Sequence, residues 1–395
     1  MRKILAGLFT LCALPACAQE MDAVLPTAIP GYGTPFAVTG EHKPPRPEPT
    51  GFTWNGLGIA PALALAGGYD SAPNGAAASS LFTAAPSLLL TDPLFGFGAF
   101  ATANAALYPS NRAQNTSGVA LGAGERAVLA RETITVSAAY LRTQETGFAL
   151  DTLSITRPVS FTVRDFRAND DVSLGMFTLT PEASATSYSF PSLTAQNRTD
   201  TRESLTTTYL PPGPLQFLLR LRATQSNYET PAFNASTNQI LAGLVDTASG
   251  LWTFSALAGA AQRQPRLGPA LTAPVLEAAL DWIPSDLDKL RLTLAREIDD
   301  PDEVSAAAYT LTEAKLSFSH EYLRTLSLKI SGEAANAAYF HSFKRETLFS
   351  TTAGASWQLG PNLALTGDYA FNDRQANYLP AANEHIFTLG MTWTP

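Results

Sequence analysis

The stretch from Thr312 to Ala334 constrains the fold more than any other part of this chain, because its apolar residues recur at every second position. Two limbs carry this pattern, and Tyr322-Leu323-Arg324 separates them. Successive side chains of an extended strand point to opposite faces, so each limb has one apolar and one polar face. The pattern predicts a two-stranded hairpin with a very short turn. Each limb has roughly ten residues, the length that a tilted strand needs to cross a bilayer.

The N-terminus indicates export. Arg2-Lys3 precedes an apolar run that ends near Leu14, and small residues follow as far as Ala18. This order is typical of a secretory signal peptide, and we expect cleavage between Ala18 and Gln19. The apolar run is too short for a membrane anchor. A lipoprotein signal, with Cys17 as the lipidated residue, is the alternative.

The composition narrows the class further. Both cysteines, Cys12 and Cys17, lie in the predicted signal, so we expect no disulfide or thiolate metal site in the mature chain. The net charge of −8 argues against a nucleic-acid partner. Hydrophobic residues make up 45% of the chain and charged residues only 15%, which is low for a soluble domain. Export, alternation and sparse charge together predict an all-β fold, a closed antiparallel transmembrane β-barrel.

Alternating runs recur eighteen times between Phe52 and the C-terminus, with 16 strands as the alternative because the runs near 162–174 and 200–210 are weak. Short turns such as Asp92-Pro93-Leu94 alternate with longer polar links such as 373–383, as at the periplasmic and extracellular rims of a bacterial barrel. The proline-rich residues before the first run should form an extended or disordered periplasmic extension. A lumen plug or a partner-docking arm is the alternative for this extension. The predicted division is a signal peptide at 1–18, the extension at 19–51 and the barrel at 52–395.

Parity also predicts which side chains face lipid. Aromatic residues lie near the predicted strand ends, where an interfacial girdle would place them: Trp54, Tyr69, Tyr108, Trp252, Trp282, Tyr322, Trp357 and Trp393. Leucines and one isoleucine on three strands should face the membrane: Leu290, Leu292, Leu294, Leu326, Leu328 and Ile330.

Several short motifs in a fixed order carry a family resemblance. They are Gly68-Tyr69-Asp70, Ala84-Ala85-Pro86-Ser87-Leu88, Arg157-Pro158-Val159, Thr178-Leu179-Thr180-Pro181, His320-Glu321-Tyr322-Leu323-Arg324 and Pro361-Asn362-Leu363-Ala364-Leu365. Over residues 55–395 the chain resembles the Gram-negative outer-membrane β-barrel porins of the second type. The resemblance implies an eighteen-stranded barrel, and several members of that family are associated with exopolysaccharide export. One departure is the ending Trp393-Thr394-Pro395, since such barrels usually end in an aromatic residue that the barrel-assembly machinery reads. Trp393 has the parity to substitute for it.

The polar face supplies the candidate pore-lining residues. By parity they are Arg220, Arg222, Glu277, Asp281, Lys289, Arg291, Glu297, Glu313, Lys315, Lys329, Glu333 and Asp368. With Asp281 opposite Lys289, Arg291 would lie diagonally between Glu277 and Asp281. Arg220 and Arg222 would form a positive strip that faces a negative strip on other strands. These charges either cross-link a wet interior or select solutes by charge and size.

No motif for metal, nucleotide or phosphate binding occurs, so we expect no cofactor and no metal site. The four histidines are scattered. Ser319 and His320 are adjacent, but neighbours on a strand point to opposite faces and cannot pair in catalysis. We therefore expect no enzymatic activity.

The leading functional hypothesis is an outer-membrane porin-like barrel with an aqueous pore for passive or semi-selective passage of small polar solutes. A conduit for secreted exopolysaccharide that works with a periplasmic export partner is the second hypothesis, and a sealed structural barrel the third. Inward aromatic residues that could guide a sugar chain are few (Phe100, Tyr108, Tyr188). The expected partners are outer-membrane lipid, lipopolysaccharide and the barrel-assembly machinery.

Overall fold

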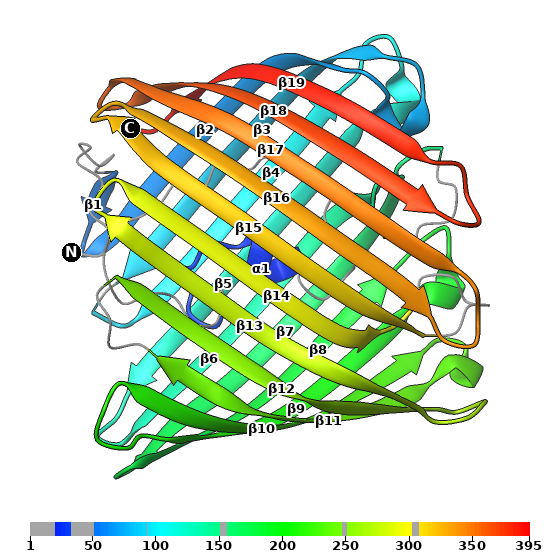
Figure 1. Ribbon diagram of the computed structural model, residues 1–395. Coiled ribbons are helices and arrows are strands. Elements are labelled where there is room, and N and C mark those ends of the chain that lie inside the picture. Colours follow the sequence, from blue (N-terminus) through cyan, green and yellow to red (C-terminus); the bar gives the residue numbers. More distant parts are fainter. Residues whose placement is uncertain (1–19, 33–50, 93, 151–155, 247–250, 302–307) are drawn as a thin grey trace.

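Eighteen antiparallel strands form one closed wall in the computed structural model, which describes residues 20–32, 51–92, 94–150, 156–246, 251–301 and 308–395 (Figure 1). The strands of the wall are β2 (Leu57–Asp70), β3 (Ser79–Asp92), β4 (Phe97–Leu107), β5 (Thr116–Val128), β6 (Glu132–Glu145), β7 (Val159–Leu174), β8 (Phe177–Ser189), β9 (Arg198–Tyr209), β10 (Leu215–Tyr228), β11 (Ala235–Asp246), β12 (Trp252–Pro265), β13 (Leu271–Ser285), β14 (Asp288–Asp299), β15 (Tyr309–Leu323), β16 (Leu326–Tyr339), β17 (Arg345–Gly360), β18 (Leu363–Ala376) and β19 (Ala382–Trp393). The predicted closed antiparallel barrel of eighteen strands is confirmed, including the two weak runs at β7 and β9.

The wall closes where β19 pairs with β2, from Trp393 opposite Leu63 to Ile386 opposite Asp70. A short additional strand, β1 (Phe52–Trp54), pairs with the start of β2, with Phe52 opposite Ile59. The barrel therefore contains one strand more than the eighteen that form its wall. The described residues also include the short helix α1 (Glu20–Val24) and four single-turn 3-10 helices: η1 (Pro73–Gly75), η2 (Arg112–Gln114), η3 (Thr194–Gln196) and η4 (Pro231–Phe233).

Connections of two kinds define the two ends of the barrel. Tight turns such as 175–176, 286–287, 324–325 and 361–362 lie at one end, which we call the short-turn rim. Longer connections such as 146–158 and 300–308 lie at the other, the long-loop rim. Gly96 (φ 65°) and Gly175 (φ 68°) occupy two tight turns with positive φ. Glycine adopts this backbone conformation with little strain, because it has no Cβ. The alternation matches the periplasmic and extracellular ends of a bacterial barrel.

Side chains alternate between an apolar outer face and a polar inner face. Leu328 and Ile330 are exposed on the outside, and Leu290 of β14 pairs with Phe318 of β15 on the same side. Seven of the eight predicted girdle aromatics are exposed, namely Trp54, Tyr69, Trp252, Trp282, Tyr322, Trp357 and Trp393. The placement of Tyr108 in the girdle is wrong. Its ring is buried inside the barrel, where its hydroxyl donates to Asp70 Oδ2 at 3.0 Å, because a buried phenol needs a hydrogen-bond partner.

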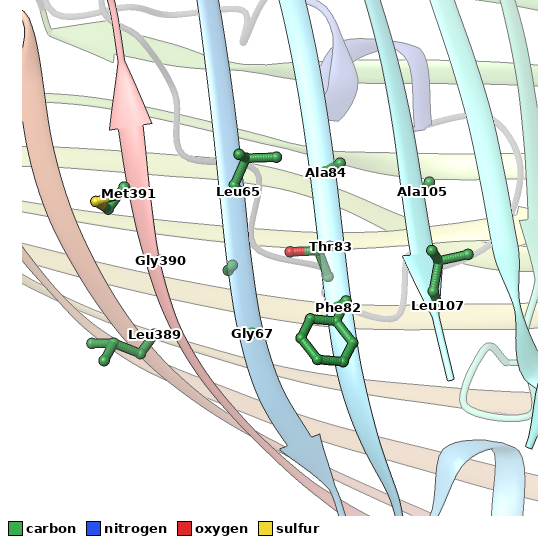
Figure 2. A pocket seen from close by; sticks show the side chains of 11 residues that line it. Leu65, Gly67, Phe82, Thr83, Ala84, Ala105, Leu107, Leu389, Gly390 and Met391 are labelled. Carbon is green, nitrogen blue, oxygen red and sulfur yellow. The ribbon is translucent and has the colours of Figure 1, made fainter. Parts of the chain in front are cut away.

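The outer face is hollowed near the seam of the wall. Figure 2 shows Leu65, Phe82, Leu107, Leu389 and Met391 around a shallow apolar depression over β19, β2, β3 and β4. Small residues form its floor, among them Gly67, Ala84 and Ala105. A lining that is apolar apart from Thr83 fits contact with hydrocarbon on the outside of the wall. Among the described residues, no helix is long and apolar enough to span a membrane.

Residues 20–32 lie inside the barrel. Figure 1 shows α1 within the ring of strands, and Met21, Leu25, Ile29 and Tyr32 are all buried there. This segment was predicted from the sequence to belong to an extended or disordered periplasmic extension, with a lumen plug or a partner-docking arm as the alternative. In the structure it forms a helical turn followed by two further turns, because its apolar side chains find an apolar patch on the inner wall. The rest of that predicted extension, residues 33–50, lies outside the described residues, as does the predicted signal peptide.

Candidate functional site

The inner face of the wall carries all twelve candidate pore-lining residues. Strand pairing shows which residues face inward. Arg220 is opposite Thr206 and the buried Leu241, and the residues before and after each of these point outward. Glu313 and Lys315 share a face with their partners Ala335 and Glu333. Lys289, Lys329 and Asp368 are nearer the short-turn rim, whereas Glu297 is near the long-loop rim. The predicted parity therefore places the charges where a channel wall would carry them.

Arg220, Arg222 and Glu277 form one ion-pair triad. Arg220 Nη1 lies 2.5 Å from Glu277 Oε2, and Arg222 Nη1 lies 3.0 Å from Glu277 Oε1. Glu277 is on β13 and the arginines are on β10, so their side chains span the concave inner surface over β11 and β12. Arg222 also donates to Gln239 Oε1 of β11 at 3.0 Å. Our prediction of separate positive and negative strips fails here, because Glu277 contacts both arginines.

A second correction concerns the register of the β13–β14 hairpin. Asp281 is opposite Arg291, and the predicted partner Lys289 lies two residues further along. The observed register differs from the predicted one by two positions, and a one-residue irregularity between Trp282 and Ser285 lies next to the turn. An even shift keeps every side chain on its predicted face. Arg291 Nε lies 3.7 Å from Asp281 Oδ1, so the pair forms directly across the two strands.

A third cluster lies on β15 and β16. Lys315 Nζ is 2.9 Å from Glu313 Oε1 on the same strand, and Glu333 is the cross-strand partner of Lys315. Two acids therefore share one lysine, with Glu313 almost fully buried. Lys329 lies four residues before Glu333 on β16, nearer the short-turn rim, and is exposed on the inner face. The charges of this region thus range from buried pairs to a water-accessible cation.

The N-terminal segment fills part of the lumen through apolar contacts. We call residues 20–32 the lumenal segment. Met21, Leu25, Ile29 and Tyr32 form one buried cluster with inner-wall residues of β3 to β8: Leu89, Phe100, Ala120, Leu141, Phe161, Val163, Tyr188 and, just beyond β8, Phe190. Burial of a large apolar side chain contributes about 1.5–3 kcal/mol. The lumenal segment is therefore packed against the wall as a core element is.

A polar network ties the same segment to β7. Arg167 Nη1 lies 2.8 Å from Asp22 Oδ1, and Arg167 Nε lies 2.7 Å from Asp165 Oδ2. The Tyr32 hydroxyl donates to Asp165 Oδ2 at 3.0 Å, and the Arg167 guanidinium lies over the Tyr32 ring at 4.7 Å. Burial, with a smaller effect of the Asp165 charge, raises the pKa of Tyr32, which keeps the phenol protonated and donating. Both ends of the segment are thus held by charge-assisted contacts.

Glycines on the inner wall make room for the segment. A Cβ on Gly124 would lie 2.2 Å from the Pro30 carbonyl oxygen, and one on Gly98 would lie 2.6 Å from that of Ala28. A Cβ on Gly122 would meet the Leu25 side chain at 2.9 Å. Real Cβ atoms do not approach other atoms so closely, so a larger residue at Gly98 or Gly124 would displace the backbone of the segment, and one at Gly122 would require the Leu25 side chain to move or to be smaller. Gly98, Gly122 and Gly124 form what we call the glycine floor of the lumenal segment.

The described ends of the connection between β14 and β15 lie inside the barrel at the long-loop rim. β14 stops pairing with β13 after Arg296, and its last residues pair with β15 alone. Asp300 then accepts a hydrogen bond from Ser226 on β10 at 2.9 Å and is ion-paired with Arg263 on β12. Ile298 and Ala308 are buried with inner-wall residues of β10 to β13. We call Ile298, Asp300 and Ala308 the β14–β15 tip. This tip covers the inner wall opposite the lumenal segment.

Residues 146–150, which follow β6, reach across the barrel. Leu150 is buried in a cluster with Tyr309, Leu311, Tyr339 and Leu348. These residues belong to β15, β16 and β17, on the opposite side of the barrel from β6 and β7. Gly147 N donates to Asn74 Oδ1 at 2.8 Å, and Asn74 donates to Gln114 Oε1 at 2.6 Å, which joins this connection to η1 and η2. Two connections thus narrow the long-loop half of the lumen.

Water reaches the inner face elsewhere. Glu182 of β8 is on the inner face, as are its cross-strand partners Asn169 and Ser204, and its side chain is exposed. Lys329 of β16, on the opposite side of the lumen, is exposed as well. Among the described residues, no group of three His, Cys, Asp or Glu residues could hold a metal ion. The arrangement is a wet, charge-lined lumen with a narrowed long-loop half.

Sequence reasoning missed the residues that narrow the lumen. Arg167 and Asp165 have the parity of inward residues, but their partner Asp22 lies far away in sequence. The inward Gly98, Gly122 and Gly124 were the available signal, since glycine in a strand interior often marks the close approach of another backbone. The role of Asp300 had no signal in periodicity, because its partners Ser226 of β10 and Arg263 of β12 lie far away in sequence.

A family model described as "Putative beta-barrel porin 2" matches residues 258–393. Over these residues the barrel is similar to that porin family. The match confirms the family resemblance inferred from the sequence, and it contains the motifs at 320–324 and 361–365. The other quoted motifs lie before the matched residues. No curated protein matches this chain.

Several solved outer-membrane proteins match this chain. The porin-like barrel is similar to OccK2 (OpdF) of Pseudomonas aeruginosa, with 12% identity and a TM-score of 0.45 over 87% of this chain and 99% of that one. It is similar to opdK of the same organism, with 13% identity and a TM-score of 0.46 over 85% and 99%. A BenF-like porin from Pseudomonas fluorescens Pf-5 gives 12% and 0.44 over 85% and 99%. At these values the likeness says nothing about substrates.

Proposed function

We propose that this porin-like barrel is a semi-selective pore for small polar solutes, narrowed by its own N-terminal segment and two in-folded connections. The observation that carries the proposal is the inner face itself, where charged residues remain in contact with water beside buried ion pairs. An eighteen-stranded wall is wide enough to enclose an aqueous channel unless something fills it. Here the lumenal segment and the tips at Leu150 and Asp300 fill part of it.

The charge arrangement favours selection over free passage. The triad of Arg220, Arg222 and Glu277 carries one net positive charge within a few ångströms, and Glu182 on β8 carries a water-accessible negative charge. Fixed charges act on solutes within about 8 Å at physiological salt. Solutes that pass this region should therefore be discriminated by charge as well as by size.

The expected processing and partners form part of the same proposal. Met21 is buried inside the lumen, so cleavage between Ala18 and Gln19 would leave a short N-terminus at that place. We propose the barrel-assembly machinery as the partner that inserts the chain, with Trp393 as the terminal aromatic signal. Mass spectrometry of the protein isolated from outer membranes tests the cleavage: a first residue other than Gln19 would contradict it.

The polysaccharide conduit receives no support. Phe100 and Tyr188 lie beneath the lumenal segment, and Tyr108 is bonded to Asp70. These aromatic rings are therefore covered and could not guide a sugar chain along the lumen.

The test is conductance of the purified, folded protein in planar bilayers, together with swelling of liposomes in solutions of sugars of increasing size. We expect discrete conductance steps, entry of small sugars and exclusion of larger ones. A heat-denatured sample is the control for detergent leakage. A folded barrel that gives neither conductance nor swelling would refute the proposal and favour a sealed structural barrel.

A further inference from the structure

Four exposed arginines gather over one sector of the barrel, at the long-loop end of β4 to β7. Arg142 is on β6 and Arg164 on β7, while Arg112 is in η2 and Arg157 immediately precedes β7. The two connections that hold Arg112 and Arg157 touch, since Gln114 Nε2 donates to the Thr156 carbonyl oxygen at 2.8 Å. All four side chains are exposed.

Arg142 and Arg164 are on the outer face of the wall. Arg142 is opposite Val119 and Thr162, and Arg164 is opposite Tyr140, whereas the neighbouring Leu141 and Val163 are buried inside the barrel. Because Arg164 follows Thr162 by two residues, the two arginines are diagonal neighbours on one face, at a spacing of about 7–8 Å. A single phosphate can accept hydrogen bonds from two guanidinium groups at such a spacing.

Their height on the wall places them at a membrane boundary. Below Arg142 the outer face of β6 carries Tyr140, Ala138, Val136 and Ile134, an apolar run with an aromatic residue at its edge. On the other side of Arg142 the outward residues turn polar, with Gln144 bonded to Ser160. A tyrosine at the edge of an apolar band marks the level of lipid headgroups. The arginine pair lies directly beyond that edge, towards the long-loop rim.

Among the described residues of the outer face, these cations have no acidic neighbour. The described outward residues of β5 to β7 beyond Tyr140 include no Asp or Glu, and the nearby Asp165 and Glu145 are buried on the inner side. Within the described ranges, none of the four arginines takes part in an ion pair. The inner arginines differ, since Arg167, Arg220, Arg222 and Arg263 all contact carboxylates. A cluster of unpaired guanidinium groups at headgroup level is a site prepared for anions.

We propose that Arg142 and Arg164, with Arg112 and Arg157 above them, bind the phosphate groups of lipopolysaccharide in the outer leaflet. The argument for this occupant is charge complementarity at a fixed height. The wall pair meets phosphates at the boundary of the hydrocarbon, and the two rim arginines meet phosphates further from it. The proposal uses the outer-membrane location and is independent of whether the lumen conducts.

The experiment compares lipopolysaccharide retention by the purified full-length barrel and its variants, measured by native mass spectrometry after exchange into lipopolysaccharide-containing nanodiscs. Arg142→Gln with Arg164→Gln should reduce retention about tenfold or more, since each charged hydrogen bond is strong. Arg112→Gln with Arg157→Gln should give a smaller loss. The matched control is Arg324→Gln, which removes an exposed arginine from a turn at the short-turn rim. Arg142→Lys with Arg164→Lys should retain part of the binding, because the charge remains.

Three further arms identify the ligand. Enzymatically dephosphorylated lipopolysaccharide should bind wild type and the double Gln variant equally weakly. Phosphatidylglycerol vesicles and inorganic phosphate should not displace bound lipopolysaccharide from the wild type at matched phosphate concentration. Equal retention by wild type and a correctly folded double variant, full binding of the dephosphorylated lipid, or displacement by free phosphate would each overturn the proposal. Folding is verified by the mobility shift of the unheated barrel on a gel.

Discussion

Arg167 is the residue on which docking of the lumenal segment should depend most. It joins β7 to the segment through Asp22 and lies over the ring of Tyr32. We predict that Arg167→Gln weakens docking and thereby increases the time that the pore spends in a wider state. The glutamine is nearly as long as the arginine but supplies no positive charge.

The structure allows the magnitude to be worked out. Asp165 and Arg167 are both on β7, so their contact at 2.7 Å persists whether the segment is docked or not. Docking itself contributes the contacts to Asp22 and Tyr32, worth about 1.5–3 and 0.5–1 kcal/mol in general. The Asp22 side chain is 30% exposed, so the lower part of the first range applies. A loss of about 2–3 kcal/mol corresponds to a shift of about 30- to 150-fold in the docking equilibrium.

The assay uses the absence of cysteine after residue 17. A Cβ on Gly122 would lie 2.9 Å from a terminal carbon of Leu25, so Leu25→Cys and Gly122→Cys place two sulfurs within reach of a disulfide when the segment is docked. Single-channel recording should show low conductance in the oxidised form and higher conductance after reduction. In the Arg167→Gln background, cross-linking should be slower and the wide state more frequent before oxidation.

Arg164→Gln is the control on the same strand, because its side chain points outward. It should leave the conductance unchanged. The reasoning fails if Arg167→Gln and the oxidised cross-link both leave conductance and open time as in the wild type, since docking would then not restrict the path.

Three other outcomes are expected. Leu292→Arg on the outer face should cost about 2–4 kcal/mol of barrel stability in reversible unfolding, and Thr293→Arg on the inner face much less, with equal losses contradicting the assigned faces. Replacing both Arg220 and Arg222 by Gln leaves Glu277 without its partners, so the reversal potential in a salt gradient should move toward cations, and this shift should shrink at high salt. A potential unchanged by this double substitution would place the triad outside the path. Asp300→Asn should release the β14–β15 tip from Arg263 and increase current noise, whereas quiet traces like those of the wild type would show that the tip is held by apolar contacts alone.

The alternation of apolar and polar residues predicted the strands of the wall, because the pattern of each strand depends only on residues near one another in sequence. The alternation around Leu328 and Leu292 follows from the two-residue repeat and from one apolar environment, so it needs no knowledge of distant residues. Asp281 was predicted to pair two positions away from its true partner, because alternation encodes neither the exact position of the 286–287 turn nor the one-residue irregularity beside it.

The contents of the lumen could not be predicted in the same way. Asp22, Leu150 and Asp300 reach strands far away in sequence, and their segments show neither strand nor long-helix periodicity. Their positions result from filling the inner space with side chains of matching shape, a property of the closed wall as a whole. The inward glycines were a local signal of this packing. They indicated that another segment approaches the wall closely, but not which segment.

The short strand β1 has a consequence for how this wall holds together. β19 ends at Trp393 opposite Leu63, so the first residues of β2 would present an unpaired edge below that point. β1 pairs with Leu57, Gly58 and Ile59 and takes up that edge, and Gly51 N donates to the carbonyl oxygen of Pro395 at 3.2 Å. The chain's two ends thus complete one ladder between them. Hydrogen exchange should accordingly begin in this shared ladder, the line along which a circular wall made from a linear chain is joined last.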